Sequence, residues 1–198
     1  MASAKPMTGK DILLLLLYSP GVADQLNEPV AGRTRLMKVL FVFKEELYAK
    51  FRFDKVVDSD ELPTFYPWRF GPFSRDVFDD IEFFSRIGFI QVARGGRGET
   101  TVEEAEEYRW WEEMTSLDDE TPPEEYAEFN EESFSLTARG VGFVREKGLY
   151  DHLSPNQKQI LKEYKARFST ASLAAIIQYV YKMYPQMTEK SEIRNRYH

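Results

Sequence analysis

The alternation of apolar and polar residues predicts a chain built mostly of helices. An unbroken apolar run over residues 12–17 predicts a buried first helix at about 10–18, which ends before Pro20. A second helix is expected with Thr34 as its N-cap, because apolar residues then recur at helical spacing as far as Phe51.

A third helix is expected at 74–87. Ser74 is a suitable N-cap, and apolar residues follow at i, i+4 and i+7 before Gly88 ends the pattern. The stretch 54–71 before it contains two prolines and several aromatic residues without a clear period, and is predicted to be a loop. Residues 1–88 are therefore expected to contain three helices and no strand.

Two short strands are predicted near the middle of the chain. Residues 89–92 and 133–136 are rich in apolar residues, and a glycine-rich turn at 95–98 follows the first of them. A helix over 137–147 follows the second strand and ends at Gly148. The two strands are separated by a segment of very different composition.

The C-terminal part is predicted to be helical. Ser154, Pro155 and Gln157 match a capping box with proline at the first helical position. Another helix carries an apolar stripe between 173 and 181 and should end at Pro185, and Thr188 is expected to cap a last short helix. No internal repeat is visible.

The order helix, helix, helix, strand, turn, strand predicts an α+β fold of winged helix-turn-helix type, in which helix 74–87 takes the recognition position. We expect one domain over 1–198. Residues 10–93 and 133–150 would form the winged-helix-like core. Residues 94–132 would be an enlarged acidic wing insert, and residues 151–198 a C-terminal helical extension.

Amino-acid composition excludes several classes of protein and site. The 198 residues include no cysteine, which excludes a disulfide scaffold and a thiolate site and is typical of a cytoplasmic protein. The apolar run 12–17 is shorter than the ~20 residues that a membrane-spanning helix needs, so no membrane association is expected. Nothing in the chain resembles a secretory leader.

No catalytic apparatus is recognisable. The only two histidines, His152 and His198, do not suit a metal pair or a general base. Asp76, Asp79 and Asp80 could gather a divalent cation, but such clusters arise by chance among 33 acidic residues. We therefore predict a non-enzymatic protein with no cofactor, no catalytic residue and no metal site.

The net charge of −7 is unevenly distributed. Residues 99–132 contain 15 acidic residues and one arginine, a net charge of −14, which leaves +7 on the rest of the chain. Helix 74–87 has a net charge of −2, so phosphate repulsion argues against its insertion into a DNA groove. If the protein binds DNA, the basic wing and the C-terminal helices are better candidates, and their residues are Arg94, Arg97, Lys158, Lys162 and Lys165.

The acidic segment contains two adjacent tryptophans. A capping-box pattern at 101–104 predicts a helix over about 102–114 that carries Tyr108, Trp110 and Trp111. Three interpretations remain open: a solvated acidic loop, a segment that folds back on the basic surface and competes with an anionic ligand, or a surface that presents the aromatic side chains to a partner protein. The last interpretation makes Tyr108, Trp110 and Trp111 the candidate partner-binding residues.

Four segments suggest a family. They lie at 32–41, 65–74, 134–140 and 179–191, and the most specific is Phe65-Tyr66-Pro67-Trp68-Arg69-Phe70-Gly71-Pro72-Phe73-Ser74. Together they resemble the SocA-like, or Panacea, antitoxin-associated domain family, over roughly 10–93 and 133–193. The acidic segment departs from the family pattern.

The resemblance implies a binding function. Some members of the family resemble antitoxins that neutralise a toxin by binding it, and SocA acts as an adaptor that delivers its toxin to a protease. The family has no recognised catalytic set, so no catalytic residue is carried over to this chain. We therefore expect a non-enzymatic, antitoxin- or adaptor-like module whose partner is a protein of a toxin or protease system. The alternative is a DNA-binding transcriptional regulator.

Overall fold

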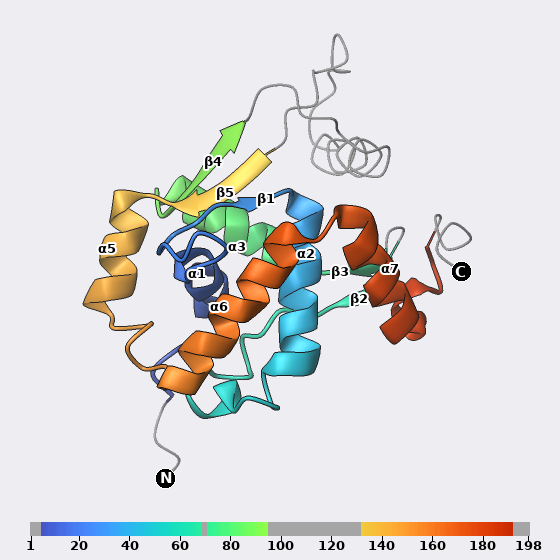
Figure 1. The fold of residues 1–198 in the computed structure, drawn as a ribbon, viewed down its shortest axis with the longest axis horizontal. Coiled ribbons are helices and arrows are strands. Elements are labelled where there is room, and N and C mark those ends of the chain that lie inside the picture. Colours follow the sequence, from blue (N-terminus) through green and yellow to red (C-terminus); the bar gives the residue numbers. More distant parts are fainter. Residues whose placement is uncertain (1–4, 69–70, 95–131, 192–198) are drawn as a thin grey trace.

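The fold was examined in a computed structural model, which describes residues 5–68, 71–94 and 132–191. It is α+β and mostly helical, with two small antiparallel sheets (Figure 1). The helices are α1 (Asp11–Tyr18), α2 (Arg33–Val42), α3 (Arg75–Arg86), α5 (Ala138–Glu146), α6 (Pro155–Thr170) and α7 (Leu173–Met183). The strands are β1 (Val30–Ala31), β2 (Tyr66–Trp68), β3 (Gly71–Phe73), β4 (Ile90–Arg94) and β5 (Glu132–Leu136).

Helix α1 lies in the interior of the molecule, as the apolar run predicted (Figure 1). Every residue from Ile12 to Tyr18 is buried, so the helix has no polar face. A helix that is apolar on all sides is stable only when other elements surround it. Within the described part of the chain, no helix is both long enough and apolar enough to cross a membrane.

The second helix begins earlier and ends differently than predicted. Gly32, with a φ of +82°, stands at its N-cap position, and Thr34 lies buried inside the first turn, so the prediction that Thr34 caps the helix was wrong. Beyond Val42 the chain continues as a π-helix, η1 (Phe43–Leu47), rather than as an α-helix. The wider turn shifts the side chains that follow it relative to the α-helical period.

The prediction of a loop over 54–71 was also wrong in part. A short 3₁₀ helix, η2 (Phe53–Lys55), is followed by the hairpin of β2 and β3, in which Pro67 lies opposite Pro72. Proline cannot donate a ladder hydrogen bond, so a proline in each strand hides the usual strand signal. Gly71 has a φ of +87°, and a Cβ there would lie 2.9 Å from the ring of Tyr181.

The second sheet has the strand order β1-β5-β4 (Figure 1). β4 pairs antiparallel with β5 from Ile90 opposite Leu136 to Arg94 opposite Glu132, and β1 pairs with the other edge of β5. The two predicted strands are confirmed, although β4 begins one residue later and ends two residues later than 89–92.

The C-terminal helices form as the local signals predicted, except at the end. Thr137 caps α5, and Ser154 with Gln157 forms the capping box of α6. Thr188, however, ends a 3₁₀ helix, η4 (Pro185–Thr188), and its hydroxyl donates to the carbonyl of Pro185. The expectation that Thr188 opens a helix was therefore wrong, because Pro185 begins the turn three residues earlier.

One hydrophobic core unites the described elements. Its buried residues run from Met7 through Tyr181 and include side chains of α6 and α7. Polar bonds also join α2 to α6: Arg35 donates to the carbonyls of Phe168 and Ala171, and the Tyr164 hydroxyl donates to the carbonyl of Val39. The C-terminal helices are therefore part of the core.

Candidate functional site

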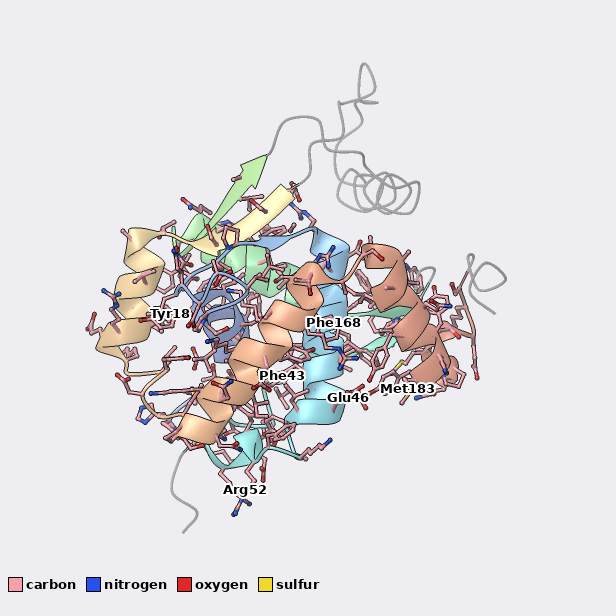
Figure 2. The ribbon with its side chains drawn as sticks, viewed as in Figure 1. Tyr18, Phe43, Glu46, Arg52, Phe168 and Met183 are labelled. Carbon is pink, nitrogen blue, oxygen red and sulfur yellow. The ribbon has the colours of Figure 1, made fainter. Side chains whose placement is uncertain are left out.

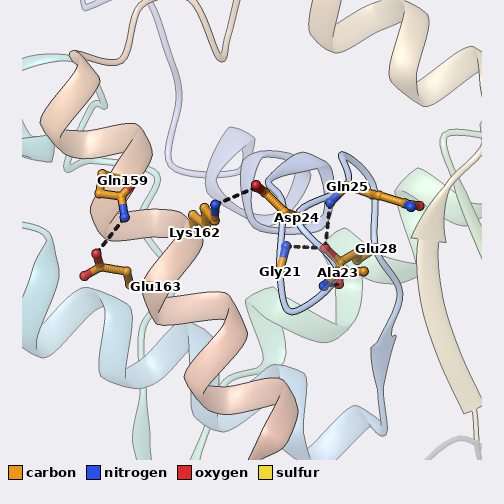
Figure 3. A network of polar contacts seen from close by, with 8 residues as sticks. All are labelled: Gly21, Ala23, Asp24, Gln25, Glu28, Gln159, Lys162 and Glu163. Atoms are coloured by element: carbon orange, nitrogen blue, oxygen red, sulfur yellow. Dashed lines mark hydrogen bonds and ion pairs between the residues drawn. The ribbon is translucent and has the colours of Figure 1, made fainter.

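The segment between α1 and β1, residues 19–29, is held by one carboxylate. Glu28 accepts hydrogen bonds from the backbone N–H groups of Gly21 at 2.6 Å, Ala23 at 3.0 Å and Gln25 at 3.0 Å (Figure 3). Desolvation opposes ionisation of this carboxyl, but the three N–H groups outweigh it and lower the pKa of Glu28. We call residues 19–29 the α1–β1 loop.

Two further contacts fasten the α1–β1 loop to distant parts of the chain. The side-chain amide of Asn27 donates to the carbonyl of Leu136 at 2.9 Å and accepts from its N–H at 2.8 Å. Asp24 forms an ion pair with Lys162 of α6, with 2.6 Å between Oδ1 and Nζ (Figure 3). Asp24 and Asn27 both have positive φ values, +57° and +63°, which asparagine and aspartate tolerate better than most residues.

The α1–β1 loop exposes two apolar side chains. Val22 is 59% exposed and Leu26 is 45% exposed, and they are two of the five large hydrophobic residues exposed in the described chain. The other three, Tyr66, Phe83 and Met183, lie on β2, α3 and α7. Of the five exposed apolar residues in the described chain, only Val22 and Leu26 lie within five residues of each other in the sequence.

Lys158 and Lys162, two of the three lysines predicted to bind nucleic acid, already have acidic neighbours on the protein. Lys158 lies 3.7 Å from the carboxylate of Asp151 and 5.0 Å from the ring centroid of Tyr150. Lys162 is paired with Asp24 of the α1–β1 loop. Phosphate contacts by either lysine would compete with these pairs.

Lys165 is buried, with 1% of its surface exposed, so the prediction that it contacts nucleic acid was wrong. Its ammonium group donates to the carbonyls of Leu17 and Ser19, both at 2.8 Å, where α1 ends. Burial lowers the pKa of Lys165 to about 7, and the nearby Glu28 acts in the opposite direction. Lys165 thus satisfies the C-terminal carbonyls of a buried helix.

The remaining predicted contact residues give less information. Arg94 is the last residue of β4, and its backbone lies opposite Glu132. Arg97, Tyr108, Trp110 and Trp111 lie outside the described residues, as does the helix predicted over about 102–114. The structure therefore leaves the partner-binding role of the two tryptophans as a prediction.

Helix α3 presents its arginines already paired with acids. Arg75 lies 3.8 Å from Asp79, and Arg86 lies 2.5 Å from Glu82, each one helical turn away. These pairs support the expectation that helix 74–87 does not enter a DNA groove.

The acidic side chains of α3 also serve the fold. Asp76 accepts a hydrogen bond from the backbone N–H of Thr64, and the buried Asp80 faces Lys10 at 3.6 Å. In the described ranges, no group of three or more acidic or histidine side chains is arranged to hold a metal ion.

A second polar cluster joins η1 to α7. The hydroxyls of Tyr179 and Tyr184 donate to the same oxygen of Glu46, at 2.5 Å and 2.9 Å; Glu46 is labelled in Figure 2. Burial, together with the hydrogen bond to Glu46, raises the pKa of Tyr179 to about 12 and raises that of Tyr184 further. The guanidinium of Arg167 lies 5.5 Å from the ring centroid of Tyr179. No local sequence pattern indicates this cluster, because the π-helix sets the direction of Glu46.

No protein-family model, curated protein or solved structure matches this chain.

Proposed function

We propose that this protein is a non-enzymatic protein-interaction module, antitoxin- or adaptor-like in character, and that the α1–β1 loop is part of its contact surface. The observation that carries the proposal is a loop fixed by polar contacts that exposes Val22 and Leu26. The resemblance to the SocA-like family supports a protein of a toxin or protease system as the partner.

The geometry of the loop favours binding over a purely structural role. Exposed apolar side chains do not stabilise the fold, whereas their burial against a partner contributes about 25 cal/mol per Å² of apolar surface. Because Glu28, Asn27 and Asp24 already order the loop, a partner would lose little free energy in ordering it.

We also propose that the fold is winged-helix-like. A three-stranded sheet of order β1-β5-β4, with α1 before β1 and with α2 and α3 between β1 and β4, supports it. In this arrangement the acidic segment would extend the wing formed by β4 and β5.

DNA binding remains the alternative and has less support. The buried position of Lys165 and the ion pairs of Lys158 and Lys162 leave α6 without a row of uncommitted cations. An interface with nucleic acid draws most of its affinity from such cations.

The proposal predicts that a double variant, Val22→Ser with Leu26→Ser, loses partner binding. The tagged full-length chain would be cross-linked in its native cell after nuclease treatment, and retained proteins would be quantified. We expect a specific protein to fall about tenfold, since the loss of a central apolar contact costs more than about 1 kcal/mol.

Met183→Ser is the matched control, because Met183 is 53% exposed but lies on α7. It should retain the same protein at the wild-type level. A double variant that retains every protein held by the wild type would refute the role of the α1–β1 loop.

A further inference from the structure

The carboxylate of Glu46 has one oxygen that the fold does not use. The hydroxyls of Tyr179 and Tyr184 both donate to Oε1, and no other described residue donates a hydrogen bond to this carboxylate. Glu46, which is labelled in Figure 2, is half-buried on the π-helix η1. Its second oxygen, Oε2, is therefore free to accept a hydrogen bond from a ligand.

The cluster carries one negative charge at neutral pH. Burial raises the pKa of Tyr179 to about 12 and raises that of Tyr184 further, so both hydroxyls keep their protons and act as donors. A neutral acceptor would satisfy these two hydroxyls equally well. The charge of a half-buried carboxylate instead costs free energy, unless a cation compensates it.

The cations on neighbouring elements are directed elsewhere. Lys44, two residues before Glu46, donates to the carbonyl of Pro63 at 2.7 Å. The guanidinium of Arg167 lies 5.5 Å from the ring centroid of Tyr179, and within the described residues no ion pair joins it to Glu46. The carboxylate thus lies beside aromatic rings without a cation of its own.

The geometry selects the type of cation that would bind. A guanidinium binds a carboxylate best through both oxygens, but Oε1 of Glu46 already accepts two hydroxyls. A compact ammonium group needs only the remaining oxygen. A divalent cation is disfavoured, because the charge of Arg167 lies beside Tyr179 and because the described ranges hold no group of three or more acidic or histidine side chains suited to a metal ion.

We infer that Glu46, together with Tyr179 and Tyr184, binds a primary alkylammonium group, either the end of a lysine side chain or a free alkylamine. The ammonium would donate to Oε2, while the two tyrosine hydroxyls hold the carboxylate in place. The site shares no residue with the α1–β1 loop or with the Met183 control. It does not depend on the proposed function, and the two can fail independently.

The test is NMR of the full-length chain with isotope-labelled tyrosine, at pH 7 and low salt. The probes are butylammonium and a blocked five-residue glycine peptide with a central lysine, arginine or norleucine. The lysine peptide and butylammonium should shift the ring signals of Tyr179 and Tyr184 saturably, and less so as salt is added. The arginine peptide should bind more weakly and the norleucine peptide should not bind. Whichever of the lysine peptide and butylammonium binds more tightly identifies a protein or a free amine as the natural source.

Three variants separate a binding role from a structural one. Glu46→Gln keeps an oxygen for both hydroxyls but removes the charge, and should weaken the lysine peptide about tenfold. Glu45→Gln is the matched control, because Glu45 is exposed and adjacent, and should change the affinity by less than about twofold. Arg167→Gln leaves the hydrogen bonds of Glu46 intact and removes an opposing charge, so it should strengthen binding about twofold even if Glu46→Gln disturbs the fold.

Four results would overturn the inference. They are the absence of a saturable shift in the wild type, equal binding of the norleucine peptide, an equal loss of affinity in Glu45→Gln and Glu46→Gln, and weaker binding by Arg167→Gln.

Discussion

At the scale of single residues, several charged side chains of this protein bind its own backbone. Lys165 and Arg35 donate to carbonyls at helix ends, and Glu28 accepts from three N–H groups. Such placements explain why a count of lysines overestimated the basic surface of α6. The helical period could have corrected this, because Lys165 lies four residues after the buried Leu161.

Asp80 gives a prediction at this scale. Burial raises its pKa from 3.8 to about 6, a shift that the nearby Lys10 opposes and that Asp76 and Asp79 increase. The folded chain therefore holds a proton that the unfolded chain has lost between pH 4 and 6, so stability falls as the pH rises through this window. Asp80→Asn should increase stability at pH 7 by about 1 kcal/mol and change little at pH 3.5.

Urea unfolding at both pH values measures this effect. Asp79→Asn is the control, since Asp79 is exposed and should give a much smaller change. A loss of stability at pH 7 in Asp80→Asn would mean that the ion pair with Lys10 outweighs the desolvation of the carboxylate.

At the scale of elements, local signals predicted two of the helix caps and missed the irregular segments. Ser74 and Ser154 cap helices as expected, because each bond is made within three residues, whereas the predicted caps Thr34 and Thr188 lie inside helical turns. The π-helix η1 and the hairpin of β2 and β3 were missed. Their geometry depends on partners far along the chain, such as Tyr179, which lies 133 residues from Glu46.

The junction of η1 and α7 gives a prediction about alkaline pH. Tyr179 and Tyr184 have raised pKa values, so above pH 10 the folded chain keeps protons that the unfolded chain releases. Stability should therefore fall between pH 10 and 12. Replacing both tyrosines by phenylalanine should make the fall shallower by up to about two protons per molecule, as measured by denaturant unfolding across this range.

The double phenylalanine variant also loses two hydrogen bonds to Glu46, so its stability at pH 8 should be lower than that of the wild type. The test is the slope with pH rather than the absolute value. An unchanged slope would show that these two hydroxyls do not control the alkaline limit.

At the scale of the whole molecule, the core was easier to predict than the candidate surface. The buried helix α1 followed from an apolar run, and the acidic segment was visible in the composition. The α1–β1 loop could not be predicted, because its order depends on Asn27 meeting Leu136, 109 residues away. Tertiary contacts of this kind leave no local pattern in a sequence.

Joining β4 directly to β5 tests the DNA alternative. Arg94 lies opposite Glu132, so a two-residue turn can replace residues 95–131 without stretching the sheet. The deletion removes 14 acidic residues and two arginines and raises the net charge from −7 to +5. Because α6 has no row of uncommitted cations, the shortened chain should still bind duplex DNA only weakly, as measured in a low-salt filter assay.

The control is α6 with Lys158→Gln and Lys162→Gln in the same shortened chain. Tight binding by the shortened chain that these substitutions abolish would support the DNA-binding alternative and the idea that the acidic segment masks a basic surface. Similar weak binding by both would support the protein-interaction proposal.

The side-chain amide of Asn27 and the guanidinium of Arg35 have a consequence for assembly. Asn27 occupies the backbone groups of Leu136 beyond β1, and Arg35 donates to the carbonyl of Ala31 on the far side of β1. This side of the sheet is thereby closed by side chains. Strand addition beyond β1 would have to break these bonds, so a partner or a second copy is not expected to extend the sheet on this side.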